Sequence, residues 1–211
     1  TAYEIRNCDW SSDVCSSDLP GVVLCHGPSI RFTDKIPYEI REYKKRRLYR
    51  GNDVRRLFYF NTIAGHNIIF RRAIFEKTLP FPEDVYYDWW ICMIASCIGN
   101  VEATHEVLAY HRFHSSNVTL GKKDEKYQTR EKAMERLRAT EVFLKIPFMK
   151  ADGIAFGKKL LSRLQALRSE KFSVRLFLFL VFHSGVIFFF KKSFFPFISK
   201  IKISYRLAWA R

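Results

Sequence analysis

Residues 176–190 form the most apolar stretch of the chain, fifteen mostly large hydrophobic side chains between Arg175 and Lys191. Side chains of this kind in such number have to leave water, in a protein core or at a membrane. A membrane-spanning helix needs about 20 consecutive apolar residues, and His183, Ser184 and Gly185 interrupt this run. The stretch is therefore too short to predict a transmembrane helix.

The residues after this run mix aromatic side chains with Lys and Arg, as segments at membrane interfaces do. We interpret residues 171–211 as a basic, Phe-rich tail that docks on an anionic membrane surface. The alternative is a buried core helix followed by a basic tail. With the docking interpretation, we expect a cytoplasmic protein, peripheral on the cytoplasmic face of the membrane.

Residues 1–19 are Ser- and Asp-rich and resemble the in-frame translation of a sequencing adapter. A genuine polar N-terminal tail is the alternative. A segment of adapter origin is not expected to contribute to the fold. Residues 1–19 carry one arginine and four acidic residues, so their exclusion raises the formal charge from +15 to +18. We expect the native sequence to be interrupted at Pro20, with further residues encoded upstream. Such a basic chain favours an anionic partner without saying which one.

Short apolar and helical segments alternate after Pro20, which predicts the α/β class. We expect strands within 21–26, 65–70 and 101–113, and helices over 71–78, 87–98, 124–145 and 154–169, with 30–38 as a loop. This organisation divides the chain into 20–121, a helical extension at 122–170 and the tail at 171–211. Three cysteines remain, Cys25, Cys92 and Cys97, and their apolar surroundings predict small core residues.

Asp88 is the carboxylate that most resembles a catalytic group. It lies at the start of the predicted helix 87–98, bracketed by Tyr87, Trp89 and Trp90. Aromatic faces stack on sugar rings, and a desolvated carboxylate among them can act as a general base. A helix N-cap is the alternative role for a carboxylate at this position.

Two other groups of residues are candidates for ligand binding. His111 and His114 follow a predicted strand, and neutral imidazoles ligate divalent metals, but no zinc-binding spacing accompanies them. Residues 41–56 include eight Lys or Arg, which suits phosphate, anionic lipid or nucleic acid, although such runs more often form a solvated surface. The chain has no GxGxxG, P-loop or GxSxG motif.

Together these segments resemble the C-terminal half of a family 2 glycosyltransferase, inverting, of the GT-A type and rhamnosyltransferase-like. The matching segments, in order, are GHNIIFRR from Gly65, LPFP from Leu79, YDWW from Tyr87, and EVLAY from Glu106 followed by RFHSSN from Arg112. The resemblance covers residues 20–120. It implies the C-terminal part of a GT-A (nucleotide-diphospho-sugar transferase) fold, followed by α-helices.

The resemblance also implies roles for individual residues. Asp88 is the general base that deprotonates the acceptor hydroxyl, and His114 completes a Mg²⁺ or Mn²⁺ site with the donor diphosphate. The residues implied to bind or position substrates are Trp89 and Trp90 on the acceptor side, Arg112 and Asn117 near the diphosphate, and Gly65 and Asn67 in the first matching segment. The implied partners are a nucleotide sugar donor and a glycan or lipid-linked acceptor, with no nucleic acid.

Two departures from the family pattern concern the site itself. Tyr87 stands where the family has His or Glu before the base, and His111 separates Tyr110 from Arg112, which leaves open whether His111 or His114 faces the metal. The resemblance places the donor-binding half and its DxD carboxylates upstream of Pro20, so this chain is expected to be incomplete as an enzyme. The alternative function is a non-enzymatic basic protein that binds nucleic acid or anionic membrane.

Overall fold

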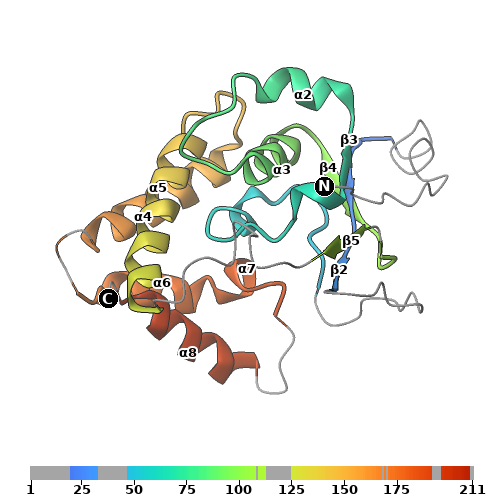
Figure 1. Ribbon diagram of the computed structural model, residues 1–211. Coiled ribbons are helices and arrows are strands. Elements are labelled where there is room, and N and C mark those ends of the chain that lie inside the picture. Colours follow the sequence, from blue (N-terminus) through green and yellow to red (C-terminus); the bar gives the residue numbers. More distant parts are fainter. Residues whose placement is uncertain are drawn as a thin grey trace.

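A computed structural model describes residues 20–32, 47–107, 109–112, 125–167, 169, 171–191 and 196–209 of the chain. The adapter-like segment 1–19 lies outside these residues. Helices and short strands mix in the described part, with helices predominating, which confirms the α/β class (Figure 1).

A three-stranded mixed sheet forms one side of the molecule (Figure 1). Its central strand is β1 (Val22–His26), which is buried along most of its length. β3 (Ile68–Phe70) pairs with β1 in the antiparallel sense, and β4 (Asn100–Ala103) pairs with it in the parallel sense. The apolar sequence of β1 therefore matches a strand with neighbours on both edges.

A second, two-stranded parallel sheet joins β2 (Ser29–Phe32) to β5 (Ala109–Arg112). Arg31 lies opposite His111 in this pair, and Phe32 lies opposite Arg112. The expectation that residues 30–38 form a loop is wrong for Ile30–Phe32. These residues become a strand because their partner lies far along the chain, where local sequence patterns give no sign of it.

Two helices follow β3 in sequence. α2 (Arg72–Thr78) is short and ends before a Pro-containing extended segment, as expected. α3 (Tyr87–Ile98) occupies the centre of the molecule (Figure 1) and has the bounds predicted for it. Its residues Ile91–Cys97 are buried almost without exception, so α3 is the core helix against which the other elements pack.

The helical extension packs directly onto this core. α4 (Glu125–Phe143) and α5 (Ala151–Ala166) contact each other, and Phe143 lies at the end of α4 among three aromatic rings. It meets Phe58 and Trp89 edge-on at ring-centroid distances of 5.8 and 5.4 Å, and it stacks on Trp90 at 6.4 Å.

The apolar run at 176–190 contributes to the same core. It forms α6 (Val174–Phe182), α7 (Ser184–Ile187) and a turn, and it is followed by α8 (Pro196–Leu207). Its buried side chains are Leu176, Phe179, Leu180, Ile187, Phe188 and Phe189. Six residues of the run therefore belong to the core, whereas Leu178 and Phe182 are exposed. No described helix is long and apolar enough to cross a membrane.

The C-terminal half of the basic run 41–56 is built into the structure, whereas residues 41–46 lie outside the described part. Tyr49 is buried, and its hydroxyl donates a hydrogen bond to Ser96. Gly51, at φ +88°, bridges to Val101 through two backbone hydrogen bonds. Asp53 caps the short helix η1 (Val54–Arg56) and pairs with Arg55 at 2.7 Å. Much of the described part of the run is therefore engaged in contacts within the protein.

All three cysteines after residue 19 are buried, as the sequence predicts. Burial raises the pKa of the Cys97 thiol to about 12 and raises the pKa of Cys92 as well. These thiols remain protonated at neutral pH and act as small core side chains.

Candidate active site around Asp88

Asp88 lies in the first turn of α3, where the helix faces the short 3₁₀ helix η2 (Gly65–Asn67). Its Oδ1 accepts a hydrogen bond from the backbone N–H of Trp89 at 2.8 Å, and its Oδ2 accepts one from the N–H of Gly65 at 3.2 Å. The carboxylate thus ties the start of α3 to a segment more than twenty residues upstream. Asp88 is not the N-cap of α3, because that position belongs to Tyr86. The two hydrogen bonds instead fix the orientation of its carboxylate.

Burial raises the pKa of the Asp88 carboxyl above its ordinary value. The hydrogen bonds from Trp89 and Gly65 and the nearby His66 act in the opposite direction and only partly compensate for burial. The helix N-terminus also favours the ionised form. A half-buried carboxylate with a raised pKa, held by two backbone donors, is a stronger proton acceptor than an exposed one.

Tyr87 covers the backbone beside this carboxylate. A Cβ on Gly65 would meet the Tyr87 ring, with Cε2 at 2.6 Å and the hydroxyl closer still. Gly65 is therefore needed so that the phenol can lie over the η2 backbone. Tyr86 and Tyr87 are 64 % and 56 % exposed, so the two tyrosines present aromatic surface to solvent next to the carboxylate.

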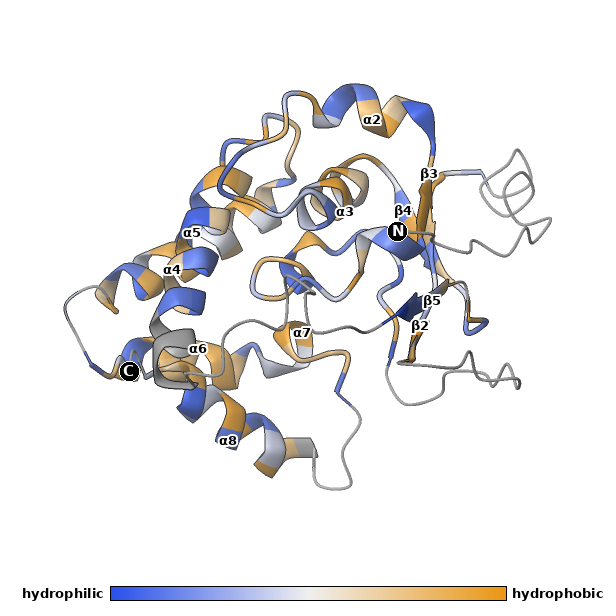
Figure 2. Ribbon diagram, in the orientation of Figure 1, coloured by the Kyte–Doolittle hydropathy of each residue, from blue (hydrophilic) through white to orange (hydrophobic). Residues whose placement is uncertain are grey.

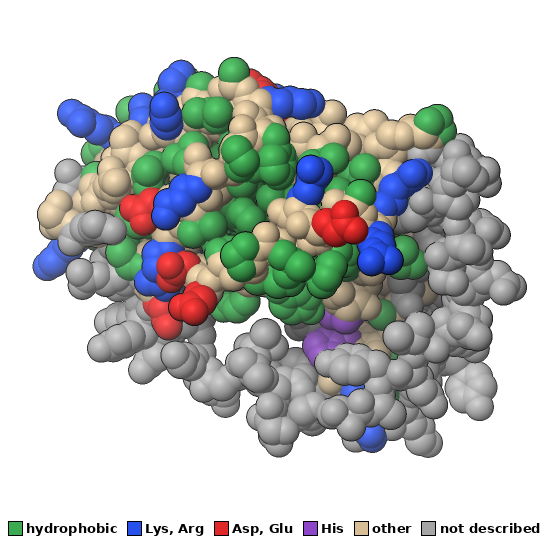
Figure 3. Space-filling view, turned by 90° about the horizontal axis from the view of Figure 1, so that it is seen from above, with side chains coloured by type: hydrophobic (Ala, Val, Ile, Leu, Met, Phe, Trp, Pro, Cys, Tyr) green, Lys and Arg blue, Asp and Glu red, His purple; other side chains and the backbone are tan. Residues whose placement is uncertain are grey.

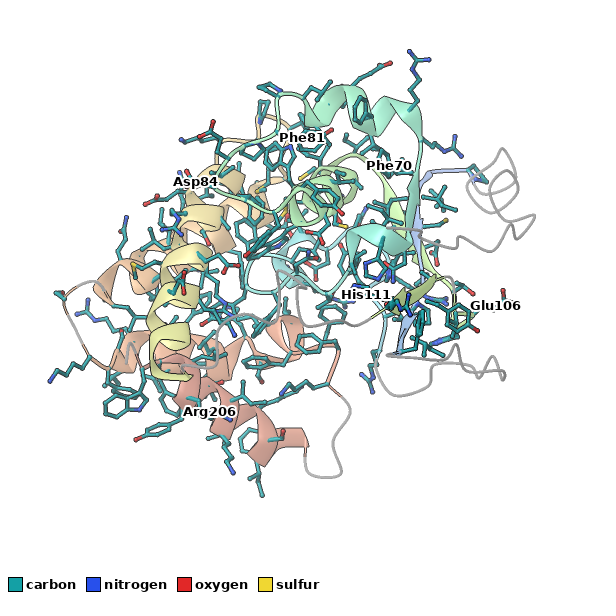
Figure 4. The ribbon with its side chains drawn as sticks, in the orientation of Figure 1. Phe70, Phe81, Asp84, Glu106, His111 and Arg206 are labelled. Carbon is teal, nitrogen blue, oxygen red and sulfur yellow. The ribbon has the colours of Figure 1, made fainter. Side chains whose placement is uncertain are left out.

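The surface around the start of α3 is unusually apolar. Seen from the side of α2, hydrophobic side chains cover a broad part of the face, and charged side chains surround them (Figure 3). The exposed large hydrophobic residues of this region are Phe75, Leu79, Phe81, Tyr86, Tyr87 and Phe148. Figure 4 places Phe81 and Asp84 in the extended segment that leads into α3.

Asn67 is buried and holds the turn after β1. Its side-chain amide donates to the carbonyl of Gly27, and its backbone carbonyl accepts from the N–H of Gly27 at 3.3 Å. Its Oδ1 is buried and has no hydrogen-bond partner among the described residues. Asn67 therefore joins η2 to the turn between β1 and β2. Its Oδ1 remains able to accept a hydrogen bond.

Two histidines lie together next to this site. The rings of His66 and His111 are 4.9 Å apart between centroids, tilted by 44°. His66 Nε2 is 3.0 Å from the hydroxyl oxygen of Ser29, and His111 lies on β5 beside β2 (Figure 4). The pair joins the small parallel sheet to η2, and His66 affects the electrostatics of Asp88.

The two tryptophans have structural positions. Trp89 is 3 % exposed, and its indole N–H donates to the carbonyl of Leu57 at 2.6 Å. Trp90 is half-buried, and its indole N–H donates to the carbonyl of Thr78 at 2.8 Å. Trp89 is enclosed by the core, so the prediction that it lines an acceptor site is wrong. The exposed aromatic surface belongs instead to Tyr86 and Tyr87.

Of the remaining predicted site residues, one is described by the structure and two are not. Arg112 is exposed at the end of β5. His114 and Asn117 fall outside the described residues, so the structure does not test His114 as the predicted metal ligand. Within the described residues, no three His, Cys, Asp or Glu side chains come together in a way that could hold a metal ion.

The sequence indicated Asp88 but gave no role to His66 or Ser29. It named Tyr87 only as an aromatic neighbour of Asp88 and as a departure from a motif. The sequence clue to His66 is its position between Gly65 and Asn67, the two residues of this segment that the resemblance implicates in substrate binding. Its contact with His111 depends on the pairing of β2 with β5, which the sequence did not predict.

Comparisons with protein-family models, with curated proteins and with solved structures found no match to this chain. Evidence on the function of this chain therefore comes from the geometry around Asp88 and from the resemblance of its motifs.

Proposed function

We propose that this chain is the acceptor-side half of an inverting glycosyltransferase of the GT-A type, with Asp88 as the general base. The observation that carries the proposal is the Asp88 carboxylate itself. It is half-buried, oriented by the N–H groups of Gly65 and Trp89, and flanked by the exposed ring of Tyr87. Its raised pKa suits a group that has to take up a proton.

In the proposed reaction, the acceptor hydroxyl gives its proton to Asp88 while its oxygen attacks the anomeric carbon of the donor sugar. The bond from that carbon to the nucleoside diphosphate breaks with its electron pair, and the configuration inverts because attack and departure occur on opposite faces. Tyr86 and Tyr87 offer flat aromatic surface against which an acceptor sugar can stack. The acceptor is a glycan or a lipid-linked saccharide.

The donor side of the proposal lies beyond these residues. A nucleotide sugar would be bound by residues encoded upstream of Pro20, and Mg²⁺ or Mn²⁺ would neutralise the departing diphosphate. The described residues do not assemble a cation site by themselves. The proposed metal ligand therefore remains His114.

We place the enzyme at the cytoplasmic face of a membrane, held peripherally by the C-terminal segment. Residues 171–211 carry eight Lys or Arg and no Asp or Glu, which suits an anionic lipid surface. The nucleic-acid alternative has less support, because the described part of the basic run is occupied by contacts such as Arg55 with Asp53 and Arg50 with the carbonyl of Ala103.

The test is sugar transfer by the full-length enzyme carrying Asp88→Asn. The substitution keeps the side-chain shape and an acceptor oxygen but removes the base, so we expect transfer to fall by about 10²-fold or more. Donor binding should be unchanged.

Asp84→Asn is the matched control, because Asp84 is an exposed carboxylate four residues upstream that pairs with Arg138 at 3.6 Å. It should transfer at the wild-type rate. Near-normal transfer by Asp88→Asn would remove Asp88 from the role of base.

A further inference from the structure

The outer side of α6 is apolar although it faces solvent. Val174, Leu178 and Phe182 are 58 %, 46 % and 80 % exposed. They are spaced by four residues and therefore lie along one side of the helix. The opposite side holds Leu176, Phe179 and Leu180 in the core. A helix in a soluble protein normally presents polar residues on the side away from the core, so this row is unusual.

The next helix continues this exposed apolar surface. On α8, Ile198 and Tyr205 are 64 % and 49 % exposed and lie seven residues apart on one side, and Phe197 at its start is 68 % exposed. Lys202 and Arg206 are exposed on the adjoining side. Apolar and polar residues alternate along α8 in Figure 2, as in helices that lie in a membrane interface.

Aromatic contacts join the two helices into one surface. Tyr205 of α8 packs against Phe177 of α6 at a ring-centroid distance of 6.2 Å and against Phe172 at 5.5 Å. The exposed apolar residues of both helices therefore lie on elements that contact each other. We call this set the α6–α8 face: Val174, Leu178 and Phe182 with Phe197, Ile198 and Tyr205.

The charged residues of the segment that forms the α6–α8 face are all basic. Arg175 is exposed beside the α6 row, and Lys171, Lys202 and Arg206 are exposed nearby. The sequence has no acidic residue from 171 to 211. Exposed apolar side chains interleaved with cations match the boundary between acyl chains and anionic headgroups, where the former are buried and the latter pair with phosphate.

We propose that the α6–α8 face is a preformed docking surface for an anionic lipid bilayer, into which its apolar side chains insert while the surrounding cations contact the headgroups. The proposal goes beyond a basic tail, because it assigns the inserted residues and requires the folded pair of helices. It does not depend on the transferase chemistry. A nucleic acid would use the cations but would gain little from Val174, Leu178 and Phe182.

The position of the α6–α8 face determines which end of the molecule meets the bilayer. α8 and α2 lie at opposite ends of the molecule (Figure 1). A bilayer on the α6–α8 face therefore leaves the apolar surface near α2 out of the membrane. The two exposed apolar surfaces of the protein can be tested separately for this reason.

The experiment is co-sedimentation of the full chain with vesicles of phosphatidylcholine, alone or with about 30 % phosphatidylserine. We expect binding to the anionic vesicles that exceeds binding to neutral ones at least tenfold and weakens as salt is raised. The double variant Leu178→Ser with Phe182→Ser should bind anionic vesicles more weakly than the wild type, by about tenfold or more, because two inserted side chains are lost. Both residues are exposed, so its thermal unfolding should match that of the wild type.

The matched control is Leu79→Ser with Phe75→Ser, which removes the same two residue types from the other end of the molecule at 52 % and 44 % exposure. This variant should bind vesicles like the wild type. The proposal is overturned if the wild type ignores anionic vesicles, or if the two double variants lose binding equally. It is also overturned if the chain binds a single-stranded oligonucleotide instead and Leu178→Ser with Phe182→Ser leaves that binding unchanged.

Discussion

At the scale of single residues, burial shifts the pKa values of several ionisable groups in this protein away from their ordinary values. For Asp88 and His26, burial shifts the pKa values in opposite directions. For Asp88 the shift strengthens a proposed base at an accessible site. His26 is 2 % exposed, and its Nε2 lies 2.9 Å from the carbonyl oxygen of Tyr49, so its shift affects stability.

Burial lowers the pKa of His26 below 6.5, with the nearby charge of Arg50 contributing in the same direction. As the pH falls below 6.5, the unfolded chain binds a proton at this histidine and the folded protein does not. The free energy of unfolding therefore falls with pH, by up to about 1.4 kcal/mol per pH unit, until the folded-state pKa is reached.

Urea unfolding of the wild type and of His26→Gln across this range measures the effect. Glutamine keeps a donor for the Tyr49 carbonyl but cannot titrate, so its free energy of unfolding should fall less steeply. Equal pH dependence in the two proteins would contradict a neutral, buried His26.

At the scale of elements, the aromatic contacts of α4 connect the helical extension to the sheet-bearing part. Phe143 is fully buried between Phe58, Trp89 and Trp90. Phe143→Ala should lower the free energy of unfolding by about 3–5 kcal/mol, because it leaves a large cavity where four rings meet. Thermal or urea unfolding measures this directly.

Phe182→Ala is the comparison for this prediction, since Phe182 is a helix residue that is 80 % exposed. Its effect on unfolding should be within about 0.5 kcal/mol. Similar losses in the two variants would show that Phe143 does not hold α4 in place.

The sequence predicted elements best where local pattern and tertiary packing agree. α3 has the expected bounds because apolar residues fill its interior and Gly99 follows its last residue. β2 was missed because its strand character depends on pairing with β5. Trp89 was misplaced because aromatic residues beside a carboxylate look alike in sequence, whether they face solvent or the core. Only the fold shows that Tyr87, and not Trp89, is exposed next to Asp88.

At the scale of the whole molecule, the three segments expected from the sequence share a single hydrophobic core. Residues of 20–112, of α4 and α5, and of α6 and α7 all belong to it. Truncation after residue 170 would remove six buried side chains from that core, among them Phe188 and Leu180. We expect the truncated chain to lose cooperative thermal unfolding, as followed by circular dichroism. Unchanged cooperative unfolding would instead show that 171–211 is an independent appendage.

The central claim is that the Asp88 carboxylate accepts the proton in sugar transfer, and the pH dependence of kcat/KM in the full-length enzyme tests it most directly. Protonation abolishes the base, so the rate should fall as the pH drops through the raised pKa of Asp88, at a pH above the ordinary 3.8 of an aspartate. Asp88→Asn should show only a low residual rate without this acidic limb. An acidic limb that persists unchanged in Asp88→Asn would contradict the account.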